Sequence, residues 1–108
     1  MILRKAYKEE LLEIFSSIDE RVEVWAYGSR INGDAHDGSD LDLVIRNQNK
    51  TPLPFSVYSN LIEKIRESNI PILVDLHDWA RLPKNFHHNI ERRYEVLFDN
   101  LHTTVKLA

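Results

Sequence analysis

Apolar residues recur along this chain with a spacing that switches repeatedly between three to four residues and two residues. The wider spacing is typical of amphipathic helices and predicts two long ones, over residues 3–18 and 55–68, with Phe55 on the apolar stripe of the second. The narrower spacing predicts strands over residues 22–27, 40–45, 70–77 and 95–98, with a short helix ending near Arg93 before the last of them. Because helices and strands alternate over short connections, we expect an α/β or α+β fold with helices packed on a sheet.

Length and composition restrict the class of protein. A chain of 108 residues that is 43% hydrophobic and 29% charged suits one globular domain, which we expect over residues 1–105, with residues 106–108 an added remnant. The absence of cysteine excludes a disulfide scaffold, and no apolar run approaches the ~20 residues of a membrane helix. A net charge of −3 argues against general nucleic-acid binding. Without a signal-peptide pattern, the chain is expected to be cytoplasmic.

All three glycines fall in one short window after the first predicted strand. Gly28 would allow backbone N–H groups to approach an anion, Ser29 adds a hydroxyl, and Arg30 adds a positive charge. The alternative is a tight turn with Ser29 as a helix N-cap, and Arg30 could serve phosphate or structure. We expect Gly33 to end a short helical turn and Gly38 to turn the chain into the next strand.

Three aspartates form the second feature of interest. Asp40 and Asp42 lie two residues apart in a predicted strand, so both project from one face and repel each other unless a cation such as Mg²⁺ lies between them. Asp75 is a lone acid inside an apolar strand, where a buried unpaired carboxylate would be costly, so we expect it to join this pair. The alternatives are aspartates in water at a strand entrance and, for Asp75, a wet strand end or an arginine partner.

The run Gly28-Ser29-Arg30 with Gly33, followed by Ser39-Asp40-Leu41-Asp42-Leu43, resembles the signature of the DNA polymerase beta-like nucleotidyltransferase superfamily. The resemblance is greatest to the minimal nucleotidyltransferases that act as antitoxins paired with HEPN-domain proteins. It implies the nucleotidyltransferase fold, with a mixed sheet. It also implies a Mg²⁺-dependent reaction that moves a nucleoside monophosphate, expected to be AMP, from ATP or another nucleoside triphosphate to a hydroxyl.

The same resemblance implies residue roles. The nucleotide would be bound by Gly28, Ser29, Arg30 and Ser39. Two Mg²⁺ ions would be held by Asp40, Asp42 and Asp75, and Asp75 would also help to activate the acceptor hydroxyl. Such a two-metal arrangement suits an in-line displacement at phosphorus.

Larger relatives carry a second domain that grips the base and the acceptor, so we expect a helical HEPN-type partner protein to complete this site. Its candidate contacts, where exposed, are Trp25, Tyr27, Trp79 and Phe86, although Trp25 is expected in the core. His87 and His88 are interpreted as surface or interface residues. The alternatives to an enzyme are a non-catalytic antitoxin that neutralises its partner by binding, and a metal- or nucleotide-binding regulatory module.

Overall fold

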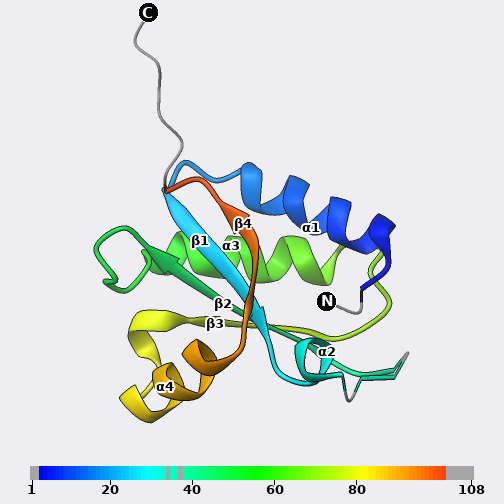
Figure 1. Ribbon diagram of the computed structural model, residues 1–108. Coiled ribbons are helices and arrows are strands. Elements are labelled where there is room, and N and C mark those ends of the chain that lie inside the picture. The colour runs from blue at the N-terminus through cyan, green and yellow to red at the C-terminus, as the bar shows by residue number, and fades with distance from the viewer. Residues whose placement is uncertain (1–2, 34, 37, 102–108) are drawn as a thin grey trace, which may run out of the picture.

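A four-stranded sheet in the order β3-β2-β1-β4 forms the centre of the computed structural model, which describes residues 3–33, 35–36 and 38–101 (Figure 1). β1 (Val22–Tyr27) pairs antiparallel with β2 (Leu41–Asn47) on one side and with β4 (Glu95–Asp99) on the other. β2 runs parallel to β3 (Val74–Asp78). The predicted small mixed sheet with packed helices is therefore confirmed, and the remnant expected at residues 106–108 lies outside the described residues.

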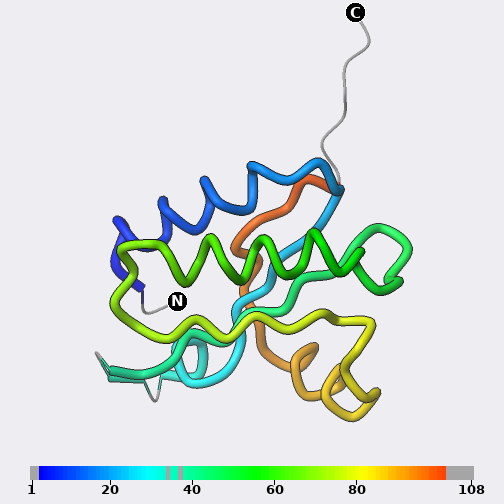
Figure 2. Tube along the Cα trace, turned by 180° about the vertical axis from the view of Figure 1, so that it is seen from behind, coloured from blue at the N-terminus to red at the C-terminus, as the bar shows by residue number. Residues whose placement is uncertain are grey.

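The helices lie on opposite faces of this sheet. The two long ones, α1 (Lys5–Ser16) and α3 (Phe55–Arg66), cover one face, and α3 passes in front of the strands in Figure 2. The other face is covered by a 3₁₀ turn (Trp79–Arg81) and by α4 (Lys84–Arg92), while α2 (Ser29–Asn32) is a single turn after β1. Among the described residues, no helix has the length and apolar character needed to cross a membrane.

Strand alternation determines which side chains reach each face. Val24 and Ala26 of β1 and Leu43 of β2 are fully buried against Leu11 and Leu61 of the long helices. Residues of opposite parity in the same strands point to the face that carries α4. The long helices therefore occupy one face of the sheet and leave the other for side chains such as Asp42.

An aromatic cluster forms a second core beneath α4. Trp25 meets Trp79 edge-on with ring centroids 5.5 Å apart, and Tyr94 stacks on Trp25 at 3.9 Å. The guanidinium of Arg46 lies 4.0 Å from the Trp25 ring centroid and donates to a Glu23 carboxylate oxygen at 2.9 Å. These contacts confirm that Trp25 is a core residue.

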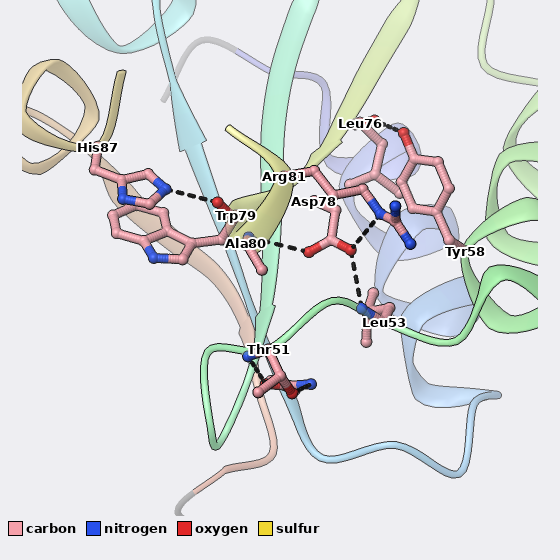
Figure 3. A network of polar contacts seen from close by, with 10 residues as sticks. Thr51, Leu53, Tyr58, Leu76, Asp78, Trp79, Ala80, Arg81 and His87 are labelled. Carbon is pink, nitrogen blue, oxygen red and sulfur yellow. Dashed lines mark hydrogen bonds and ion pairs between the residues drawn. The ribbon is translucent and has the colours of Figure 1, made fainter. Parts of the chain in front are cut away.

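Exposure decides which of the candidate contacts in this cluster remain open to a partner. Trp79 is buried, so it cannot present its ring to a partner, whereas Phe86 is 49% exposed. His87 is not a free surface residue: its ring stacks on Trp79 at 3.8 Å, and its Nε2 lies 2.6 Å from the Trp79 carbonyl oxygen (Figure 3). The short helix and the 3₁₀ turn fold back on each other, which periodicity alone did not reveal. Exposed His88 agrees with its surface interpretation.

The predicted element boundaries need correction at several ends. The third strand begins at Val74 rather than at residue 70, because its pairing with β2 starts only where Leu41 N–H donates to the Leu73 carbonyl. β2 begins one residue after Asp40 and continues to Asn47, and both long helices are shorter than expected. Phe55 is 76% exposed because it opens α3 at the end of the helix.

Asp78, at the end of β3, holds the segment that joins β2 to α3 (Figure 3). Its buried carboxylate accepts from Leu53 N–H at 2.9 Å and from Ala80 N–H at 3.2 Å, and Arg81 Nε lies 3.3 Å away. These bonds satisfy backbone donors at the point where the chain leaves the sheet. One buried acid therefore fixes the connection before α3 and the turn after β3 together.

We expect Asp78→Ala to lower the free energy of unfolding by about 1–3 kcal/mol, because it leaves the buried Leu53 N–H without an acceptor. Urea unfolding followed by circular dichroism measures this change. The exposed Asp19→Ala variant is the matched control and should stay within about 0.5 kcal/mol of the unmodified chain. Equal midpoints for the two variants would show that Asp78 does not have this role.

Candidate active site

Strand register brings the predicted carboxylates together on the face that carries α4. Asp42 of β2 lies opposite Tyr27 of β1 on one side and opposite Asp75 of β3 on the other. Asp40 immediately precedes β2 and shares the parity of Asp42. The parallel pairing thus makes Asp75, far along the chain, a direct neighbour of the Asp40–Asp42 pair, as the sequence predicted.

The electrostatics of these groups indicate excess negative charge. Partial burial, followed by the neighbouring Asp75 and Asp40, raises the pKa of the Asp42 carboxyl, whereas His77 acts in the opposite direction. Burial, Asp42 and Asp75 together raise the pKa of Tyr27 to about 12, which keeps its hydroxyl protonated at neutral pH. A carboxyl whose pKa is raised by neighbouring carboxylates is stabilised in its ionised form by an added cation.

Asp75 differs from its predicted environment. Its side chain is half-exposed instead of buried, because β3 is an edge strand whose outer residues on this face meet solvent; Leu73 on the same face is 64% exposed. Its Oδ2 lies 3.1 Å from His77 Nε2, which satisfies the carboxylate without an arginine. The buried acid of this strand is Asp78, which serves structure.

The donor set suits a hard divalent cation. Carboxylate oxygens are the ligands that Mg²⁺ prefers, and Asp42 has two acidic neighbours. Among the side chains that the structure describes, no three acidic or histidine groups are already close enough to enclose an ion. Asp40 is exposed and Asp75 is half-exposed, so the packing of the fold encloses neither carboxylate. The residues therefore fit Mg²⁺ by chemistry and by position on the sheet.

Two features require glycine at position 28: its backbone conformation and the close approach of Asp42. Its φ of +81° lies in a region that other residues rarely adopt, and a Cβ there would come within 2.4 Å of Asp42 Oδ2. A side chain would thus collide first with the carboxylate of the site itself. Gly33, at φ +85°, ends α2 in the left-handed conformation, as the sequence predicted.

Ser29 is not the N-cap of α2, because Gly28 occupies that position and its carbonyl accepts from Ile31 N–H and Asn32 N–H, each at 3.0 Å. Ser29 is instead the first residue of the helical turn. Within the described part of the chain, no hydrogen bond of its hydroxyl was found. Ser29 directly follows Gly28, the residue whose backbone lies against Asp42.

Arg30 is directed into the protein. It is 5% exposed and donates to the Ser39 carbonyl from Nε at 3.1 Å and from Nη2 at 2.7 Å, with a further contact to the His36 carbonyl. The Ser39 hydroxyl accepts from His36 N–H at 2.9 Å. These contacts favour the structural alternative for Arg30: it ties α2 to the segment that leads into Asp40.

Beside Gly28, a hollow of about 490 Å³ lies between the end of β1, α2 and α4. Six of the residues that line it are Tyr27, Gly28, Asn32, Asn89, Arg92 and Arg93. No role was predicted from the sequence for the last four of these residues. The two adjacent arginines could have indicated an anion site from the sequence. However, nothing in the spacing of the residues indicated that α4 returns to the end of β1.

Comparison with known proteins agrees with this geometry. Residues 9–103 match the family described as "Polymerase beta, Nucleotidyltransferase". A relative from Haemophilus influenzae, named as a probable protein adenylyltransferase, MntA, is 38% identical over 103 residues, which cover 92% of this chain and 89% of the relative.

Two solved structures share the fold. A chain from the crystal structure of a toxin–antitoxin with AMP-PNP superimposes with a TM-score of 0.69 at 18% identity, covering 89% of this chain and 76% of that one. A structure from Sulfolobus solfataricus, described as a nucleotidyltransferase, gives 0.56 at 20% identity, covering 95% and 86%. The match over nearly the whole chain and the similarity to MntA establish that this protein belongs to the polymerase-beta nucleotidyltransferase family.

Proposed function

We propose that this protein is a Mg²⁺-dependent adenylyltransferase that moves AMP from ATP to a hydroxyl of a partner protein, and that it acts as the antitoxin of a toxin–antitoxin pair. The observation that carries the proposal is the register that makes Asp42 and Asp75 neighbours beside Gly28. The name of the Haemophilus influenzae relative supports protein adenylylation, and the toxin–antitoxin neighbour with AMP-PNP supports the pairing.

In this proposal each residue has a separate task. Asp40, Asp42 and Asp75 would hold two Mg²⁺ ions, which when bound neutralise phosphate charge and polarise the attacking and leaving oxygens. Gly28 and Ser29 would bind the triphosphate through backbone N–H groups and a hydroxyl. The acceptor oxygen bonds to the α-phosphorus as the bond to the bridging oxygen breaks, and pyrophosphate leaves.

The acceptor would approach from the side of β3. That strand is an edge of the sheet, and the half-exposed Asp75 carboxylate faces solvent there. Asp75 would take the proton that the acceptor hydroxyl releases, with His77 beside it. The opposite neighbour, Tyr27, keeps its proton at neutral pH because its pKa is about 12, so it would serve as a hydrogen-bond donor.

The partner would be a helical HEPN-type protein. Among the four aromatic contacts expected from the sequence, Phe86 is exposed and Tyr27 is half-buried, while both tryptophans lie in the core. Exposed Phe86 and Tyr94 are therefore the better candidates to reach a second protein.

We expect Asp42→Asn to reduce AMP transfer at least about a hundredfold, because the central carboxylate of the site loses its charge. The chain is purified with its natural partner, incubated with ATP and Mg²⁺, and the intact mass of the partner is measured. Glu63→Gln, an exposed change of the same kind on α3, is the control and should transfer normally.

The same variants separate catalysis from simple binding. If Asp42→Asn still neutralises the partner in cells as well as the unmodified chain, transfer is not how this antitoxin works. A gain in mass on the partner that persists in Asp42→Asn would instead contradict the assignment of the site.

Mg²⁺ should raise the melting temperature of the unmodified chain and not that of Asp42→Asn.

The folded-state pKa of Asp42 is raised, so its ionised form destabilises the fold, and stability falls as the pH rises through that pKa. Without Mg²⁺, Asp42→Asn should therefore melt higher than the unmodified chain at pH 7, and this difference should shrink in acid. Calorimetric melting at pH 7 and in acid measures the pH dependence, and melting at pH 7 with and without Mg²⁺ measures the effect of the metal. A lower melting temperature for Asp42→Asn than for the unmodified chain at pH 7 without Mg²⁺ would contradict the expected destabilisation by ionised Asp42.

Gly28→Ala should abolish transfer and also lower the free energy of unfolding by about 1–3 kcal/mol. The new Cβ would collide with Asp42 Oδ2, and alanine would have to adopt the strained positive φ of this position. Gly38→Ala is the control: its Cβ would lie 3.4 Å from the nearest His36 atom, and its φ is not in the strained region. The partner-mass assay and urea unfolding measure the two effects. If Gly28→Ala and Gly38→Ala had the same transfer activity and the same stability, Gly28 would have no special role and the glycines would serve only as a flexible loop.

A further inference from the structure

The hollow between α2 and α4 carries two cations. Arg92 and Arg93 are exposed and line it, and within the described residues neither guanidinium forms a hydrogen bond or an ion pair. By contrast, the buried guanidinium of Arg30 is bound to loop carbonyls. Two adjacent cations without a carboxylate partner suit an anion better than an uncharged group.

This hollow adjoins the carboxylate site. Gly28 and Tyr27 form part of its wall, and both face Asp42: a Cβ on Gly28 would touch Asp42 Oδ2, and Tyr27 is the cross-strand neighbour of Asp42. The hollow lies on the β1 side of Asp42, whereas Asp75 lies on the β3 side. A ligand that spans both regions would meet carboxylates at one end and arginines at the other.

A nucleoside triphosphate bound to Mg²⁺ has this distribution of charge. Its Mg²⁺ needs carboxylates nearby, and its terminal phosphates need hydrogen-bond donors and positive charge in addition to the metal. The volume of about 490 Å³ is within the usual range for small-molecule sites, and the amides of Asn32 and Asn89 add hydrogen-bonding groups to its wall. A nucleobase would leave the two arginines uncompensated.

We infer that this hollow receives the terminal phosphates of the nucleoside triphosphate, the part that leaves as pyrophosphate, with Arg92 and Arg93 as their cationic ligands. This inference rests on the nucleotidyltransferase function proposed above. It assigns α4, for which no chemical role was predicted from the sequence, to substrate binding. The acceptor hydroxyl would still approach Asp75 from the side of β3.

The double variant Arg92→Gln/Arg93→Gln tests this assignment. The chain is titrated by calorimetry in Mg²⁺ with ATP, AMP and inorganic tripolyphosphate. We expect ATP and tripolyphosphate to bind at least about tenfold more weakly, because charge-assisted hydrogen bonds to phosphate are lost, and AMP to bind as before. The control, Arg4→Gln/Arg66→Gln, removes two exposed charges at α1 and α3 and should match the unmodified chain.

Each other outcome is decisive. An equal loss for AMP and ATP, or no loss for either, overturns the subsite while leaving the proposed function standing. Arginine-dependent binding of tripolyphosphate by a chain that does not bind ATP supports the subsite and overturns the nucleotide substrate. An unmodified chain that binds neither ATP nor tripolyphosphate overturns both.

Discussion

The parallel pairing of β2 with β3 is the constraint on which the candidate site depends. It sets Asp42 directly beside Asp75, although the two belong to strands separated by the whole of α3. A parallel pair requires a crossover, and here α3 supplies it while packing on the face opposite the carboxylates. The same helix thus closes the main core and leaves the other face of the sheet free for chemistry.

The face that carries the site is supported by the aromatic cluster under α4. Trp25 and Val44 occupy that face directly behind Tyr27 and Asp42, and Trp79 with His87 fastens α4 to them. This packing keeps the start of β2 and the end of β1 in a fixed relation. It also brings the end of α4, with its two arginines, to Gly28, so one cluster positions both charged regions.

Local patterns predicted the parts of this protein that depend on local geometry. Two-residue alternation placed Val24 and Leu43 on the core face and Asp42 on the other, because successive side chains of a strand point to opposite faces. The exposure of Asp75 and the burial of Trp79 could not be predicted, since both depend on which strand is an edge and on where α4 folds. Arg30 binds carbonyls several residues away, and no spacing encodes such a contact.

By itself, the sequence determined the alternation of helices and strands, the short run that places Gly28 and the aspartate pair together, and through them the family. Only the tertiary structure decided that Asp75 stands half-exposed beside His77, that Arg30 serves the loop, and that Arg92 and Arg93 line the hollow by Gly28. The physical reason is that periodicity and short motifs act over a few residues. Burial and charge proximity instead arise from pairing and packing between segments far apart in the chain.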